Sequence, residues 1–377
     1  MPHLTGLDPT ISFYSASAFV LGLIFGSFLN VVIHRVPRGE SIVFPGSHCA
    51  ACGAPIKAFD NIPLVSFALL GGRCRSCRAR ISLSYPAVEL GAGLTFVAIV
   101  FKTGPSWEAL LEFAFACVMI SLVFIDARHQ LLPDVITYPA FLFALIGVTA
   151  RAALGEQSAP TLDVSTLFPG LQTEFSPWRA ALFGGALFAT AAPAFWLLDR
   201  LDPILFGKYF DEEVVEQTKI CSRQTEVCPT IRATMIIGVI AAVAWAAMAV
   251  FLSPNHQQAI QAIGDAYDGL LRAGAGALIG GGLVWCIRAL YFFIRGFEGM
   301  GLGDIKMMSV VGAFLGFGGA MGVLLLGSII GVIAGLILIY YRGSGGPGFK
   351  TPLPFGACIG VASLIMMILS TFNFAKP

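Results

Sequence analysis

The sequence predicts an all-α polytopic membrane protein with about eight to ten transmembrane helices, and three observations support this prediction. Of the 377 residues, 56% are hydrophobic and only 12% are charged, which is about half the charged fraction of ordinary soluble domains. The mean hydropathy is +0.81. The apolar residues also gather in runs that can cross a bilayer core about 30 Å thick, which needs roughly 20 residues per helix.

Ten apolar runs are candidate transmembrane helices. Several are short or contain Gly and Pro, so the predicted count is a range of eight to ten. The first run lacks the basic segment and small-residue cleavage site of a removable signal peptide, so we expect it to remain as the first transmembrane helix. The ten runs are 11–33, 86–101, 108–125, 134–150, 180–198, 233–252, 273–294, 305–320, 322–341 and 355–373.

The Lys and Arg residues predict how the chain is oriented in the membrane. If the N-terminus lies outside the cytoplasm, the loops at 34–85, 126–133, 199–232, 295–304 and 342–354 face the cytoplasm. All but five of the 23 Lys and Arg residues then lie on the cytoplasmic side, as the positive-inside rule predicts. The five exceptions are Lys102, Arg151, Arg179, Arg272 and Lys376.

Four of the nine cysteines form two Cys-x-x-Cys pairs in the first of these loops. Cys49 and Cys52 are separated by 21 residues from Cys74 and Cys77. Structural disulfides are rare in the reducing cytoplasm, whereas thiolates paired at this spacing suit tetrahedral Zn²⁺. Four cysteine ligands indicate a structural ion, because a catalytic zinc keeps an open position. We expect a small zinc-ribbon-like domain over 34–85; the alternative is four unliganded thiols.

Two aspartates stand at the cytoplasmic ends of predicted helices. Asp126, in "FIDARHQLLPD", directly follows the third run, and Asp304 lies among glycines in "GMGLGDIKMM". Four predicted spans separate them, an even number, so both end on the same face of the membrane. Two neighbouring carboxylates cannot both ionise easily, so they share a proton, and one acts as a base toward water while the other acts as an acid. We expect this chemistry from the pair.

Other interpretations of the acidic residues remain. Each aspartate alone could be a helix-end residue that faces headgroups and water, and Asp134 is expected to cap the helix that it precedes. The sequence has no His-Glu-x-x-His motif and no Gly-x-Ser-x-Gly motif, which disfavours a zinc protease and a serine hydrolase. A membrane transporter with a cytosolic zinc module is the alternative function. Transporter sites usually lie near the bilayer midplane, unlike these span-end aspartates.

The motifs resemble those of bacterial prepilin peptidases, the GxGD-type membrane aspartic proteases that process type IV pilins and type II secretion pseudopilins. "GSFLNVVIHRVPRGESI" is similar to the first-span signature of that family, and the Cys-rich segment is similar to its cytoplasmic zinc-binding domain. "FIDARHQLLPDVIT", "FEGMGLGDIKMM" and "LPFG" at 353–356 resemble the later motifs. The resemblance assigns Asp126 and Asp304 as the catalytic pair. It assigns Cys49, Cys52, Cys74 and Cys77 as the zinc ligands.

The resemblance also implies a function and a location. Members of this family remove the short basic leader from prepilins or pseudopilins at the cytoplasmic face of the bacterial inner membrane. Members with the cysteine domain are typically bifunctional, and they N-methylate the new N-terminal residue with S-adenosylmethionine. The chain has no glycine-rich nucleotide fingerprint after a predicted strand, so the methyltransferase activity rests on the resemblance alone. The expected partners are prepilin substrates and membrane lipid, with no nucleic acid.

The predicted domain organisation departs from the family only in its middle. Residues 151–272 are longer than usual and are expected to form an insert with an extra transmembrane hairpin. On either side we expect a first helix over 1–33, the Cys-rich domain over 34–85, helices with the first aspartate over 86–150, and helices with the GxGD motif over 273–377.

Overall fold

The computed structural model describes residues 9–154, 256–296, 300–342 and 354–370, and its regular secondary structure there is helical. The prediction of an all-α protein is confirmed. The α-helices are α1 (Pro9–Arg35), α2 (Val65–Leu69), α3 (Ser84–Thr103), α4 (Trp107–His129), α5 (Asp134–Ala153), α10 (His256–Arg295), α11 (Leu302–Arg342) and α12 (Phe355–Leu369).

Six of the described helices are long and apolar enough to cross a membrane, namely α1, α3, α4, α5, α10 and α11, and α12 is a shorter apolar helix. The chain is therefore a multi-pass membrane protein. Helices α1, α3, α4, α5 and α12 lie where the apolar runs predict them. The expected spans 180–198 and 233–252 lie outside the described residues.

Two helices differ from their predicted bounds. Helix α10 begins at His256, well before the apolar run at 273, because helical backbone continues through the Ala- and Gln-containing segment that precedes it. Helix α11 contains both of the runs expected at 305–320 and 322–341. Its helical backbone is interrupted at Gly316, with φ 72° and ψ −178°, rather than at 321. A positive φ is readily adopted by glycine, so this residue accommodates the break.

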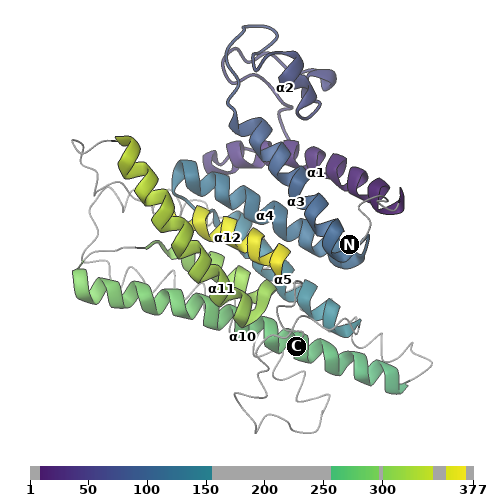
Figure 1. Cartoon of the computed structure of the whole chain (residues 1–377), viewed down its shortest axis with the longest axis vertical. Coiled ribbons are helices and arrows are strands. Elements are labelled where there is room, and N and C mark those ends of the chain that lie inside the picture. Colours follow the sequence, from purple (N-terminus) through teal and green to yellow (C-terminus); the bar gives the residue numbers. More distant parts are fainter. Residues whose placement is uncertain (1–8, 155–255, 297–299, 343–353, 371–377) are drawn as a thin grey trace, which may run out of the picture. The chain divides into compact units, whose positions relative to one another are not determined.

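The described chain divides into two compact units. One comprises residues 1–136 and 322–377, and the other residues 137–321. In the first unit, α1 packs along α3, and α4 packs against both α3 and α12 (Figure 1). The core of this unit contains Leu29 and Ile33 of α1, Val88 and Ala92 of α3, and Ile120 and Ile125 of α4.

Close contact and a buried ion pair hold the helices of the first unit together. A Cβ atom on Gly26 of α1 would lie 2.6 Å from the Cα of Glu89, so only glycine allows α1 to approach α3 this closely. At the other end of α3, the buried Lys102 ammonium lies 2.7 Å from Glu112 of α4. It also donates to the Met367 carbonyl of α12 at 2.6 Å. One cation thus joins three helices, and its charge is paired as burial requires.

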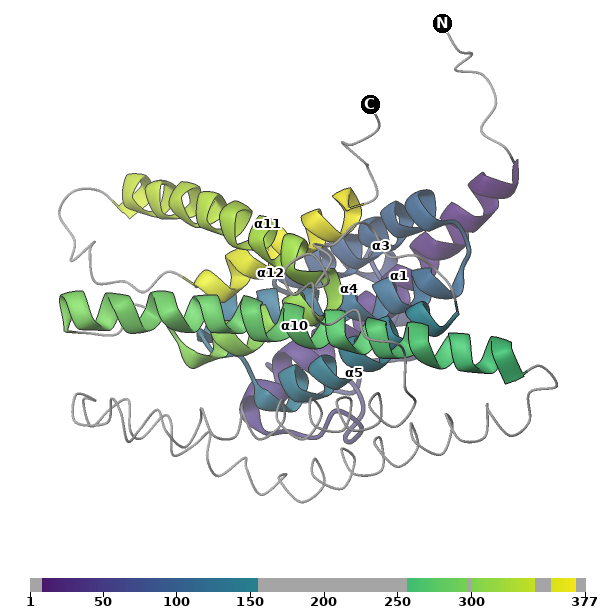
Figure 2. The same ribbon diagram turned by 90° about the horizontal axis from the view of Figure 1, so that it is seen from below.

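In the second unit, glycines let α10 lie against the first part of α11 (Figure 2). A Cβ atom on Gly276 would come within 2.2 Å of the Gly312 carbonyl oxygen, and one on Gly312 within 2.1 Å of the Gly276 oxygen. Small residues at such positions are typical of membrane helix packing. This contact holds the first part of α11, which carries Asp304 in its first turn, against α10.

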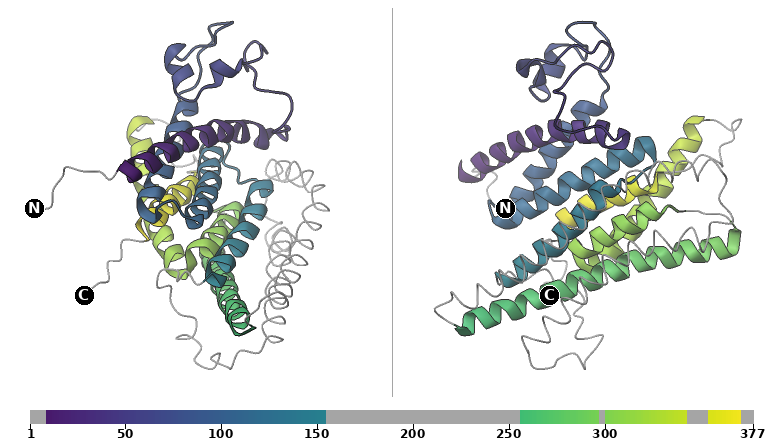
Figure 3. Two further views of the ribbon diagram at one scale, coloured as in Figure 1. Left: turned by 90° about the vertical axis from the view of Figure 1, so that its right-hand side faces the viewer. Right: turned by 180° about the vertical axis from the view of Figure 1, so that it is seen from behind.

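Residues 36–83, between α1 and α3, form a small module that we call the cysteine module. It projects beyond the ends of α1 and α3 (Figure 3). Besides α2 it contains the short 3-10 helices η1 (Val36–Arg38) and η2 (Ala58–Asn61). Its two isolated antiparallel bridges join His48 to Pro55 and Arg73 to Arg80. The expected zinc-ribbon-like module is therefore present, although turns rather than extended strands build it.

Candidate active site and metal centre

The two Cys-x-x-Cys pairs form turns with the same hydrogen-bonding pattern. The Cys49 N–H donates to the Ala54 carbonyl at 2.9 Å, and the Gly53 N–H donates back to the Cys49 carbonyl at 2.8 Å. In the second pair, the Cys74 N–H donates to Ala79 at 2.9 Å, and the Arg78 N–H donates to Cys74 at 3.0 Å. The fourth residue after the first cysteine has a positive φ in both turns, at Gly53 and Arg78. Each turn therefore aims its two thiols in one direction.

The four thiols converge to one point. The sulfur atoms of Cys49, Cys52, Cys74 and Cys77 all lie within 4.8 Å of one another, and the Cys49 and Cys77 sulfurs are 3.9 Å apart. Tetrahedral zinc with Zn–S bonds of about 2.3 Å places its sulfurs roughly 3.8 Å apart. The cluster thus has the size and the donor set that a zinc ion requires.

The electrostatics of the cluster also favour a bound cation. N–H groups, chiefly that of Cys52, point at the Cys49 sulfur and lower the pKa of this thiol to about 6. At Cys77 the Ala79 N–H favours the thiolate, but hydrogen bonds with the other thiols, Cys52 first, outweigh it and raise the pKa to about 11. Four thiols this close cannot all ionise unless a positive ion lies among them, and the thiolate is the form that binds metal.

Asp126 lies in the last turn of α4, where the end of the helix fixes it. Gln130 follows α4 in the left-handed conformation, and its N–H donates to the Asp126 carbonyl at 2.9 Å. The Asp126 side chain is buried, with only 5% of its surface exposed. Its Oδ2 atom accepts a hydrogen bond of 2.7 Å from the Ala357 N–H. A carboxylate is thus held inside the protein by a backbone donor from a distant helix.

The donor to Asp126 belongs to the start of α12. This helix begins at Phe355 after Pro354, so the last two residues of the "LPFG" motif, Phe355 and Gly356, form its first turn together with Ala357. The first N–H groups of a helix have no partner within the helix, and together they favour a negative charge. The motif was recognisable in the sequence, but its contact with Asp126 was not predicted.

Asp304 lies in the first turn of α11, within the second unit. Its side chain is also buried, with 7% exposed, and its N–H donates to the Gly301 carbonyl at 3.3 Å. A Cβ atom on Gly301 would lie 4.0 Å from the Asp304 Oδ2 atom, so a larger residue there would stand beside the carboxylate. Both aspartates that the sequence singled out are therefore buried carboxylates at the ends of apolar helices.

A second buried charge lies on the same turn as Asp304. Lys306 is 8% exposed, and its ammonium lies 5.3 Å from the centre of the Tyr138 ring of α5. This is the distance of a cation–π interaction. Tyr138 was missed by the sequence analysis, because nothing in its local sequence connects it with a residue on α11.

Asp134 lies where the sequence analysis placed it, at the beginning of α5. Its expected capping role stays a prediction. Asp134 serves as a control position when Asp126 and Asp304 are substituted.

Comparison with known proteins gives one family match. Residues 20–103 match the family model described as the Bacterial Peptidase A24 N-terminal domain. This match covers most of α1, the whole cysteine module and α3.

Curated relatives extend the similarity to nearly the whole chain. The chain is 26% identical to the prepilin leader peptidase/N-methyltransferase of Pseudomonas aeruginosa, an alignment that covers 98% of this chain and 94% of the relative. It is 27% identical to that of Aeromonas hydrophila, over 94% of this chain and 90% of the relative. The protein of the same name from Neisseria gonorrhoeae is 42% identical over 39% of this chain and 58% of its own length. No solved structure matches.

Proposed function

We propose that this chain, which belongs to the bacterial prepilin peptidases, removes the leader peptide of type IV prepilins or pseudopilins and then N-methylates the new N-terminal residue. The observation that carries the proposal is the similarity along 98% of the chain to a protein with both activities in its name. The curated relatives compared above carry peptidase names, so the transporter alternative is not supported.

In the proposed cleavage reaction, Asp126 and Asp304 share one proton. The ionised carboxylate takes a proton from water, which attacks the scissile carbonyl, while the protonated carboxyl donates its proton to the carbonyl oxygen. As the tetrahedral intermediate collapses, the carboxyl that took the proton from water gives it to the leaving amine, and its partner takes a proton back from a hydroxyl of the intermediate. The Ala357 N–H donates a hydrogen bond to Oδ2 of Asp126. Its Oδ1 atom is the oxygen proposed to face the water. Burial of both side chains supports this assignment, because their charges are then little screened by solvent.

The proposed location of the reaction is the cytoplasmic side of the inner membrane. The distribution of Lys and Arg supports this orientation, since few of these residues fall in the loops on the opposite side. The cysteine module then lies in the cytoplasm next to the ends of α1 and α3. Residues 151–272 are proposed to be an insert with an additional transmembrane hairpin, which leaves the sidedness of both aspartates unchanged.

Two cofactors are proposed, with separate roles. Cys49, Cys52, Cys74 and Cys77 would hold a structural Zn²⁺, which the geometry of the cluster fits. Its contribution is to the fold of the module, because structural zinc binding is coupled to folding. S-adenosylmethionine, when bound, supplies the methyl group of the second reaction.

The function is tested with the purified full-length protein in detergent and a model prepilin. The expected result is cleavage at the leader junction without S-adenosylmethionine, and cleavage with the mass gain of one methyl group in its presence. A protein that holds zinc and remains folded but leaves several prepilins and pseudopilins uncut would contradict the proposal. Mass spectrometry of the products measures both reactions in one experiment.

Replacing Ala357 with proline should reduce cleavage about 10- to 100-fold. Proline deletes the N–H that binds Asp126, and a hydrogen bond to a charged group contributes about 1.5–3 kcal/mol. The first turn of a helix tolerates proline, and Gly356 before it has no Cβ to clash with the ring. The measurement is kcat/KM for a model prepilin. The control is Ala357→Gly, which keeps the N–H; equal rates for the two variants would show that this hydrogen bond has no role.

A further inference from the structure

We propose that a cavity between α1 and the cysteine module binds the methyl donor, S-adenosylmethionine. The cavity has a volume of about 380 Å³, and all of its walls belong to the first unit. Small-molecule sites usually occupy about 300–1,000 Å³. The proposal rests on the methyltransferase activity proposed above and assigns that activity a place in the molecule.

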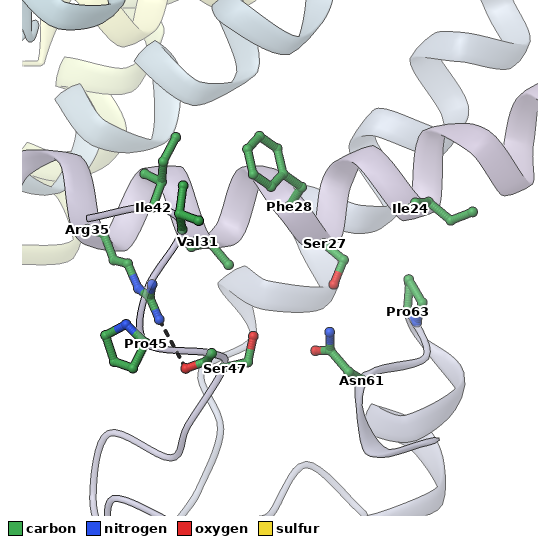
Figure 4. Close-up of a pocket in the computed structure, with 12 residues that line it drawn as sticks. Ile24, Ser27, Phe28, Val31, Arg35, Ile42, Pro45, Ser47, Asn61 and Pro63 are labelled. Atoms are coloured by element: carbon green, nitrogen blue, oxygen red, sulfur yellow. Dashed lines mark hydrogen bonds between the residues drawn. The ribbon is translucent and has the colours of Figure 1, made fainter. Parts of the chain in front are cut away.

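The chemistry of the walls fits a ligand with both apolar and polar parts. Ile24, Phe28 and Val31 of α1 contribute apolar surface, and loops of the cysteine module close the other side. Among its polar residues, Ser27 and Asn61 face each other across the cavity, and Ser47 also lines it (Figure 4). The adenine ring and the aliphatic part of the donor suit the apolar surface. The ribose hydroxyls and the amino acid group suit the hydroxyl and the amide.

Buried charged side chains hold the walls in place. The Arg35 guanidinium at one end of the cavity donates to the Ser41 carbonyl at 2.9 Å and to the Gly46 carbonyl at 3.2 Å. On the other side, Glu89 of α3 accepts the Leu64 N–H at 2.9 Å. Arg35 and Glu89 are 7% and 8% exposed. The loops on both sides of the cavity are thus tied to the transmembrane helices, and the cavity is formed before any ligand binds.

The cavity lies on a different face of α1 from the proposed cleavage site. Leu29 and Ile33 of α1 pack in one cluster with Ile125, the residue next to Asp126. Ser27 and Val31, by contrast, line the cavity. At 3.6 residues per turn these two sets point in different directions. The cavity is therefore separate from Asp126, as two independent reactions require.

The family match supports the same division. The matched domain, residues 20–103, contains every residue that lines the cavity and neither of the two aspartates. A chain with two activities and one pair of proteolytic carboxylates needs a second place for the second reaction. Among the residues that the structure describes, this cavity combines sufficient volume with polar groups that point inward.

The methyl transfer that the cavity would host balances without a further reactant. The neutral α-amine of the cleaved pilin attacks the methyl carbon of the sulfonium. The N–C bond forms as the C–S bond breaks, the sulfur keeps the electron pair as a thioether, and one proton passes from nitrogen to water. An α-amine has an ordinary pKa of about 7.7–8.0, so a substantial neutral fraction exists near neutral pH. The oxygens of Ser27 and Asn61 offer acceptors for N–H groups of the reactants.

The first test compares binding and cleavage in full-length, zinc-loaded variants. Ser27→Leu and Asn61→Leu each replace one polar side chain of the cavity with a larger apolar one. We expect at least tenfold weaker binding of radiolabelled S-adenosylmethionine in equilibrium dialysis, a matching fall in methylated product, and cleavage within twofold of wild type. The control is Leu69→Ala on α2, an exposed position outside the cavity, which should retain both activities. Wild-type donor binding in both leucine variants would overturn the proposal.

The second test uses the wild-type protein, so it does not depend on how a variant folds. Ultraviolet crosslinking of the radiolabelled donor, followed by peptide mapping, should place the label within residues 20–47 or 57–64. Label confined to other peptides would overturn the assignment of the cavity. If the wild-type protein and both leucine variants methylate pilin equally well, the assignment of the cavity is wrong, but the proposed methyltransferase activity stands. A wild-type protein that cuts prepilin but never binds the donor also refutes the proposed second activity.

Discussion

Asp126→Asn and Asp304→Asn should each reduce prepilin cleavage by about 10³- to 10⁴-fold. Asparagine keeps the shape of aspartate and its ability to accept the Ala357 N–H, but it can neither take a proton from water nor give one to the substrate. Loss of one general acid or base typically removes a factor of about 10²–10⁴, and the loss of the shared proton disables both partners. Initial rates of leader removal in detergent measure the effect.

Asp134→Asn is the matched control for this prediction. Asp134 also stands at a helix end and belongs to the same "FIDARHQLLPDVIT" motif as Asp126, and asparagine serves about as well as aspartate at the start of a helix. We expect wild-type cleavage from this variant. A loss equal to that of Asp126→Asn would mean that any polar substitution in this region disturbs the site, and the assignment of Asp126 would lose its support.

Removing the zinc should unfold the cysteine module and abolish methyl transfer. Structural zinc contributes about 10–16 kcal/mol of binding free energy in small domains, and that energy is coupled to folding. Residues 36–83 have only isolated bridges and short helices, so we expect the ion to contribute a large part of the stability of the module. Cys74→Ser should lower the zinc content below one ion per chain. It should also expose the module to trypsin, which cleaves after its Arg residues.

Cys286→Ser is the control for the zinc prediction. Cys286 is an exposed thiol on α10, outside the cluster. This variant should bind one zinc ion and resist trypsin as the wild type does. Metal analysis and the tryptic pattern measure the outcome. A chelator-treated protein that has lost its zinc but keeps the module protected would contradict the structural role of the ion.

Local sequence predicted the parts of the site that depend on local spacing. Two Cys-x-x-Cys pairs predicted a four-thiol cluster, because each pair forms its own turn and the two turns together supply the four ligands of one tetrahedral zinc ion. Apolar runs predicted most of the helices, because the bilayer sets their length. Asp126 and Asp304 were recognisable because a carboxylate at the end of an apolar run is rare without a function.

Contacts between distant segments were not predictable in this way. The Ala357 N–H and Asp126 are 231 residues apart in the sequence, and only the packing of α12 against α4 brings them together. The same holds for Glu89 and Leu64, which hold the cysteine module against α3. The break in α11 falls at Gly316 rather than at 321, because several nearby glycines could adopt a positive φ and helix packing selects one of them.

If Asp126 and Asp304 cut the prepilin while methylation takes place elsewhere, the two reactions can be separated by mutation. Mass spectrometry measures both in one experiment, with a prepilin and the same pilin already cleaved, each incubated with S-adenosylmethionine and wild-type, Asp126→Asn or Asp304→Asn enzyme. We expect both variants to leave the prepilin uncut and still methylate the cleaved pilin at the wild-type rate. If either variant cuts the prepilin at the wild-type rate, that aspartate is only a helix-end residue and the proposed mechanism is wrong.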